Sequence, residues 1–260
     1  MKVYPLTLET IQGLINHPRH KWLIRISLCF IVLAGGVLLS TDPVLQKSSY
    51  HLLADNRSWL STPNFADVIS NLPFAIIGLA GLLYCLSNRN DTSLSWQVYF
   101  MGLILVAAGS SYYHWNPNNQ TLAWDRLPMT VCFMSLFVAL LGEHVPCQFE
   151  KIILSASLLL GISSVVYWHY TGDLRFYGLI QFGTLAAIPL ILLLYKSTFT
   201  HRHYLIYGLV CYGLAKIMEL NDSRIFELTG GLISGHTAKH LFAAAASYYV
   251  YLMLKKRQAY

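Results

Sequence analysis

The sequence predicts an all-α membrane protein with a core of seven transmembrane helices and one extra N-terminal transmembrane helix. Composition is the first observation, because 55% of the 260 residues are hydrophobic and only 12% are charged. A soluble domain carries about twice that charged fraction. The second observation is a series of stretches of roughly 18–20 residues with few charges, the length that an α-helix needs to cross a bilayer. The chain is therefore expected to fold as packed helices within a membrane.

The first apolar stretch, 22–39, is expected to form the extra helix. Its basic flank resembles that of a secretory signal, but the apolar stretch is long and no small-residue cleavage site follows Leu39. An uncleaved anchor helix is therefore the better prediction. Residues 1–45 then form a cytoplasmic segment with the extra helix, and residues 46–260 form the seven-helix core.

Seven further apolar stretches are expected to form the core, each long enough to cross the hydrocarbon layer. The seventh of the eight spans is the weakest, since it is short and contains Lys216. The core spans are predicted over 68–87, 95–114, 125–142, 151–168, 176–195, 204–218 and 236–254.

The net charge of +6 indicates the orientation of the chain rather than a nucleic-acid partner. Most of the 18 basic residues lie before the first span, after the last span or in alternate loops, so they belong to one side of the membrane. Because cytoplasmic loops carry the excess of Lys and Arg, both termini are predicted in the cytoplasm. Membrane lipids are the expected surroundings, and no obligate protein partner is expected.

Polar residues are predicted to gather at the outer (periplasmic or lumenal) end of the bundle. His114 ends the third span there, and Asp125 begins the fourth. His236 and His240 lie in the first turns of the last span, four residues apart and therefore on one helical face. Ser110 lies one turn deeper than His114. Ionisable groups within membrane spans are costly, so this gathering favours a functional site.

Three imidazoles and a carboxylate at one depth are typical of a catalytic zinc site. Zinc in such sites takes three protein ligands, and the water in its fourth position ionises near pH 7. The ligand set is predicted to be His114, His236 and His240. Asp125 can accept and return a proton, and Ser110 can donate a hydrogen bond to the oxyanion of an attacked carbonyl. The pattern predicts a metal-assisted hydrolase that acts on an acyl bond.

Each of these residues alone has a more ordinary interpretation. A single interfacial histidine more often contacts lipid headgroups. Asp125 beside Arg126 is typical of a surface ion pair, and Ser110 beside Gly109 is typical of small-residue helix packing. Only their joint placement favours a site. His169, at the outer end of the fifth span, is the one plausible substitute ligand.

Three other functions fit parts of the pattern. A non-enzymatic seven-helix receptor could keep zinc for structure. A cofactor carrier could hold haem between paired histidines or a retinal Schiff base on Lys216, and a transporter could use an intramembrane proton relay. A structural zinc has no open position for water, which separates a receptor from an enzyme. A haem or retinal protein would be coloured.

The spacing of the site residues resembles the motif of the alkaline ceramidases, seven-helix zinc membrane hydrolases related to adiponectin-receptor-like proteins. The motif reads Ser110-x3-His114, Asp125 and His236-x3-His240. Segment 64–74 (NFADVISNLPF) is also similar to the entry into the first core helix of that family, and the resemblance covers about residues 55–251. It implies zinc on the three histidines, with Ser110 and Asp125 assisting. The implied reaction hydrolyses the amide of ceramide-like N-acyl lipids to a fatty acid and a sphingoid base or other amine.

Two features depart from that family: the extra helix and the calcium site. Eukaryotic members bind calcium with an acidic cluster before the first core helix, whereas Asn64 stands here where an acidic ligand is expected. Asp55 and Asp67 remain as candidate ligands, so a requirement for Ca2+ is doubtful. Lys216 and Glu219 share one face of the seventh span. They form either a buried ion pair that braces the site or a snorkelling lysine with a loop glutamate.

Overall fold

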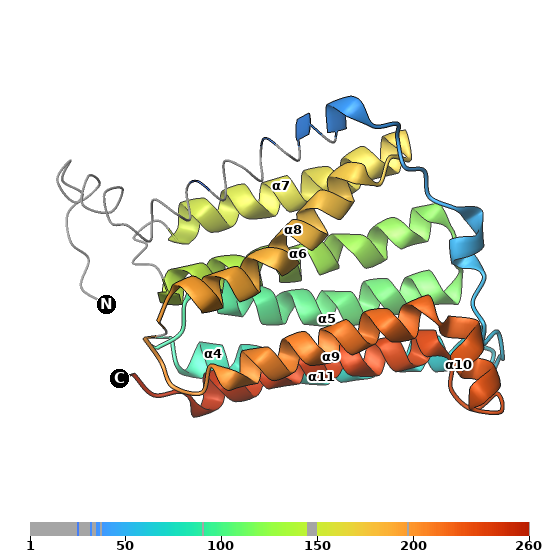
Figure 1. Ribbon diagram of the computed structural model, residues 1–260. Helices are drawn as coiled ribbons and strands as arrows, with labels where there is room; N and C mark the ends of the chain where they lie inside the picture. Colours follow the sequence, from blue (N-terminus) through green and yellow to red (C-terminus); the bar gives the residue numbers. More distant parts are fainter. Residues whose placement is uncertain are drawn as a thin grey trace.

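The computed structural model describes residues 38–89, 91–144, 150–196 and 198–259, together with Arg25, Val32, Gly35 and Gly36 (Figure 1). The extra helix predicted over 22–39 falls largely outside the described residues. From residue 40 onward, the elements of the described chain are helices joined by loops, which confirms the all-α class.

Long helices form a bundle with their axes side by side (Figure 1). They are α4 (Leu72–Ser87), α5 (Leu94–Trp115), α6 (Asn119–His144), α7 (Glu150–Thr171), α8 (Arg175–Leu194), α9 (His203–Leu220) and α11 (Gly235–Lys256). Shorter elements are η1 (Ser48–His51), α3 (Phe65–Ile69) and α10 (Asp222–Leu228). In the described chain α5 packs against α4 and α6, α6 also contacts α7 and α8, and α11 packs against α9 and α4.

Five stretches of the described chain are long and apolar enough to cross a membrane. They are Phe65–Ser87, Leu94–Trp115, Asn119–Glu143, Glu150–Thr171 and Arg175–Leu194. Helices α9 and α11 are not among them, since they carry lysines, histidines and a glutamate that lower their mean hydropathy. An integral membrane protein is thus supported, while the count of seven spans stays a prediction.

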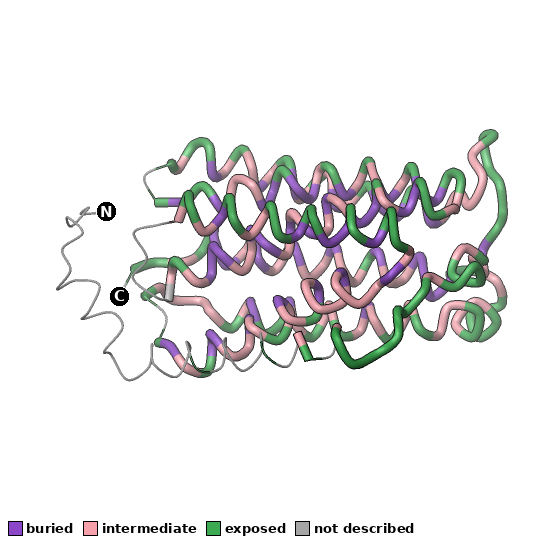
Figure 2. Tube along the Cα trace, turned by 90° about the horizontal axis from the view of Figure 1, so that it is seen from above, coloured by how far each residue is buried: buried purple, intermediate pink, exposed green. Residues whose placement is uncertain are grey.

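Buried positions recur along the helix sides that face their neighbours (Figure 2). The outside of the bundle instead exposes large apolar side chains, among them Ile76, Leu79 and Leu83 of α4 and Ile152 and Leu159 of α7. Exposed apolar surface of this extent is unusual for a soluble monomer and suits contact with lipid chains.

The predicted boundary at Asp125 is wrong. Helix α6 begins at Asn119, so the loop predicted between the third and fourth spans shrinks to a few residues. The Asn118 side chain explains the early start, because its oxygen accepts hydrogen bonds from the backbone N–H groups of Gln120 (2.9 Å) and Thr121 (3.1 Å). Asp125 therefore lies in the second turn of α6, where it is 5% exposed.

Two further predictions of continuous elements need correction. The span predicted over 68–87 is divided into α3 and α4 by a turn at Ser70 and Asn71, and Pro73 lies in the first turn of α4. The predicted outer loop 219–235 contains the short helix α10. Both irregular segments lie beside the predicted site, so they position side chains there.

Candidate metal centre

Three histidines meet at the end of the bundle where α5 ends and α11 begins. One ring nitrogen each of His114, His236 and His240 lies within 4.8 Å of the others. The ring centroids are 4.6–5.0 Å apart, and all three side chains are buried. Nitrogens bound to one zinc at 2.0–2.1 Å can be at most about 4.2 Å apart, so small side-chain rotations would complete a common site. The structure therefore brings together the three predicted ligands.

The hydrogen bonds of these histidines fit a metal site. Both ring nitrogens of His114 and Nε2 of His240 are buried and have no hydrogen-bond partner among the described residues. Buried polar atoms of this kind are normally satisfied, and a bound cation would satisfy these nitrogens. His240 Nδ1 lies 2.7 Å from the hydroxyl of Ser70, which itself donates to the carbonyl of Asp67 at 3.0 Å. Nδ1 of His240 must then carry the proton, which leaves the Nε2 lone pair free for a metal.

His236 contacts a lysine, Lys239, that belongs to a cluster of two lysines and one glutamate. Lys239 Nζ lies 3.1 Å from Nε2 of His236 and 2.9 Å from Glu219. Glu219 also binds Lys216 at 2.8 Å. Of the two alternatives for Lys216 and Glu219, the structure has the ion pair, and the same carboxylate also binds Lys239. Sequence reasoning gave Lys239 no role, because a lysine within a span is equally typical of snorkelling.

Asp125 and Ser110 lie beside the histidines, on neighbouring helices. Both side chains are buried, and Ser110 is close enough for its hydroxyl to interact with the Asp125 carboxylate. Gly109 permits this proximity, since any side chain at that position would collide with the backbone of Trp124 on α6. Asp125 is not paired with Arg126, whose guanidinium instead binds Gln46 at 2.7 Å and stacks on an aromatic ring.

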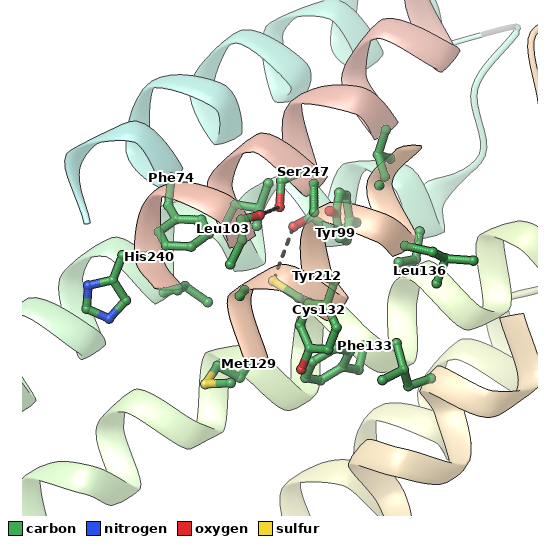
Figure 3. A pocket seen from close by; sticks show the side chains of 18 of the residues that line it. Phe74, Tyr99, Leu103, Met129, Cys132, Phe133, Leu136, Tyr212, His240 and Ser247 are labelled. Atoms are coloured by element: carbon green, nitrogen blue, oxygen red, sulfur yellow. Dashed lines mark hydrogen bonds between the residues drawn. The ribbon is translucent and has the colours of Figure 1, made fainter. Parts of the chain in front are cut away.

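An elongated cavity of about 140 Å³ begins at this cluster, roughly ten times the volume that one water needs. His240 lies at one end of it, and apolar side chains such as Leu136 lie at the other (Figure 3). Its polar lining includes Asn71, Ser110, Asp125, Lys216, Lys239 and His240. On α6 the lining residues run from Asp125 to Leu140, a helix length of about 22 Å at 1.5 Å per residue.

The acidic residues considered as calcium ligands contact groups of the protein itself. Arg57 binds Asp55 at 2.6 Å, and this hydrogen-bonded arginine lowers the pKa of the aspartate. Asp67 accepts a hydrogen bond from Thr237 at 2.6 Å. Asn64 donates to the backbone carbonyl of His114 at 2.8 Å, so it supports a histidine. Oδ2 of Asp67 is buried and has no hydrogen-bond partner among the described residues, and the doubtful requirement for calcium stays a prediction.

His169 does not join the cluster. Its side chain is exposed and packs against the neighbouring aromatic rings of Trp168 and Tyr170. Among the described residues, His114, His236 and His240 form the only group of at least three metal-ligating side chains that could share an ion. The substitute ligand considered from the sequence is therefore not needed.

Residues 61–259 match the model of the protein family described as Ceramidase. The chain belongs to the ceramidase family. This match confirms the resemblance seen in the spacing of the site residues. No curated protein matches the chain. Membership of the ceramidase family supports a membrane enzyme that hydrolyses ceramide, and therefore a hydrolase of amide bonds with a lipid amide as substrate.

Proposed function

We propose that this ceramidase-family protein is a zinc-dependent amidase. It cleaves the amide bond of ceramide-like N-acyl lipids to a free fatty acid and a sphingoid base or other amine. The observation that carries the proposal is the buried group of His114, His236 and His240, which could share one metal ion. Nitrogens of His114 and His240 have no hydrogen-bond partner among the described residues, and His240 lies at the polar end of an apolar cavity.

The residues around the histidines supply the remaining chemistry. Zinc, when bound there, provides a Lewis acid and an activated water at neutral pH. Asp125 takes a proton from the attacking water and delivers it to the amide nitrogen as the C–N bond breaks. Ser110 donates a hydrogen bond to the carbonyl oxygen as negative charge develops on it. The burial of Asp125 and Ser110 strengthens both interactions, because the surroundings screen charge less than water does.

The apolar part of the cavity accepts a hydrocarbon chain. Its lining between Asp125 and Leu140 is almost entirely apolar, with side chains such as Met129, Phe133 and Leu136. An acyl chain placed there leaves its carbonyl at the polar end, beside His240. Burial of a chain contributes about 0.8 kcal/mol per CH2 group, so this part of the cavity supplies most of the binding free energy.

The distribution of basic residues supports an orientation with both termini in the cytoplasm. Cytoplasmic termini place the histidine cluster near the outer (periplasmic or lumenal) face of the membrane. The acidic residues Asp55 and Asp222, the latter at the start of α10, lie at this end of the bundle, and Asp222 accepts a hydrogen bond from the backbone N–H of His236 at 2.7 Å. A lipid substrate would enter from the outer leaflet or between helices.

Metal analysis combined with a lipid hydrolysis assay tests the proposal. Protein purified in detergent should contain about one zinc per chain. It should release fatty acid from N-acyl sphingosine, and chelation of the metal should abolish that release. Zinc-loaded protein that hydrolyses no N-acyl lipid would favour a receptor with a structural zinc instead. A visible absorption band would favour a haem or retinal carrier.

A further inference from the structure

Asn71 is a buried residue of the cavity with an unused hydrogen-bond acceptor. It lies in the turn between α3 and α4, is 0% exposed, and lines the cavity that also contains Ser110 and His240. Its amide nitrogen donates to the carbonyls of Asp67 (2.9 Å) and Val68 (3.4 Å). Its Oδ1 atom is buried and has no hydrogen-bond partner among the described residues.

The orientation of the Asn71 amide follows from these bonds. Only the NH2 group can donate to two backbone carbonyls, so the oxygen must be the free end of the side chain. Rotation of the amide to hide the oxygen would place it against the same carbonyls and would break both bonds. A buried acceptor without a donor costs free energy, and native proteins seldom leave one unmatched.

The position of Asn71 relates this acceptor to the reaction. The preceding residue, Ser70, contacts Nδ1 of His240 at 2.7 Å. In this turn, the Ser70 side chain therefore contacts the candidate metal ligand His240, and the next side chain, Asn71, lines the substrate cavity. Of the other polar side chains in the lining near His240, Lys216 and Lys239 are donors. Asp125 is assigned to proton transfer and Ser110 to the developing oxyanion. Asn71 therefore offers a neutral acceptor close to the bond that is cleaved.

We propose that Asn71 is a specificity residue, whose Oδ1 accepts a hydrogen bond from the substrate. This inference rests on the proposed amidase function and names the substrate feature that the site requires. The donor is the amide N–H or a hydroxyl next to it, both of which a ceramide carries. Lipids that lack the donor leave the Asn71 oxygen buried and unpaired, and sites built around a hydrogen bond discriminate strongly against such analogues.

The test uses three substrates with the unmutated, zinc-loaded protein: N-acyl sphingosine, its N-methyl amide, and its analogue without the C3 hydroxyl. We expect kcat/KM to fall at least about tenfold for one of the two analogues. Loss with the N-methyl amide would identify the amide N–H as the donor, and loss with the deoxy analogue would identify the hydroxyl. Equal kcat/KM for all three substrates would overturn the inference while leaving the amidase function intact.

Variants separate the acceptor from steric effects of the analogues. Asn71→Leu has a similar volume and no acceptor, so the sensitive analogue should then be hydrolysed within about twofold of the parent lipid. Asn71→Ala also lacks a side-chain acceptor and should behave in the same way. If either variant folds, binds zinc and still rejects the analogue as strongly as the unmutated protein, Asn71 serves only the turn. Absence of any N-acyl lipid hydrolysis would instead overturn the amidase function and this inference with it.

Discussion

Substitution of Glu219 tests whether one carboxylate holds two lysines at the site. The two ion pairs have N–O distances of 2.8 and 2.9 Å. Removing one partner of a fully buried pair costs about 3–5 kcal/mol, because the remaining charge is left uncompensated. Lys216 is 31% exposed and Lys239 is 14% exposed, so partial solvation reduces that cost. We expect Glu219→Gln to destabilise the protein by about 2–4 kcal/mol.

Thermal unfolding in detergent, followed with a thiol-reactive dye, measures this loss. Cys85 and Cys132 are buried, so their thiols react with the dye as the bundle opens. Glu227 is an exposed glutamate of α10, and Glu227→Gln is the matched control, with an expected change within about 0.5 kcal/mol.

A double variant that combines Glu219→Gln with Lys239→Met tests whether the lost stability comes from the uncompensated lysine charge. Lys239→Met removes one of the two cations that Glu219 neutralises, so it should partly rescue Glu219→Gln. The combined loss should be smaller than the sum of the two single losses. Simple additivity, or a Glu219→Gln protein that unfolds at the temperature of the Glu227→Gln control, would show that the charge cluster does not stabilise the site.

Three other outcomes are expected. Alanine at any one of the three histidine ligands should abolish hydrolysis and lower the zinc content, and full zinc occupancy in such a variant would reject the ligand assignment. Asp125→Ala should keep its zinc but lose at least about 100-fold in kcat, so unchanged turnover would reject the proton-transfer role. Hydrogen bonds from Arg175 lower the pKa of Asp173 to about 2 from an ordinary 3.8. The Asp173–Arg175 pair therefore stabilises the folded protein fully above the ordinary pKa of an aspartate, and this stabilisation is lost as the pH falls towards the lowered pKa. Asp173→Asn should unfold at a lower temperature at neutral pH, and its melting temperature should fall less on acidification than that of the unmutated protein.

The helices and the histidine group could be predicted from sequence because their signals are local. Long apolar stretches predict membrane helices, and the spacing of His236 and His240 places both on one face. The start of α6 was missed because its first turn, with Gln120 and Thr121, is polar and resembles a loop. The capping oxygen that makes it helical belongs to a side chain outside the helix.

Contacts between distant segments were beyond sequence reasoning. The turn at Ser70 and Asn71 lies within an apolar stretch, so hydropathy alone cannot locate it. This turn contacts the histidine group through Ser70 and His240, which lie 170 positions apart in the chain. The pairing of Lys239 with Glu219 likewise requires the packing of α9 against α11. Such contacts follow from tertiary structure rather than from local patterns.

Two of the three histidines lie on the last helix, α11, which begins at Gly235. A ribosome therefore completes the chain up to α10 while His114 is the sole member of the group. A growing polypeptide cannot capture the ion through this set of ligands until its final helix has been made and inserted. A product that stops before Gly235 would lack two of the three histidines of this group.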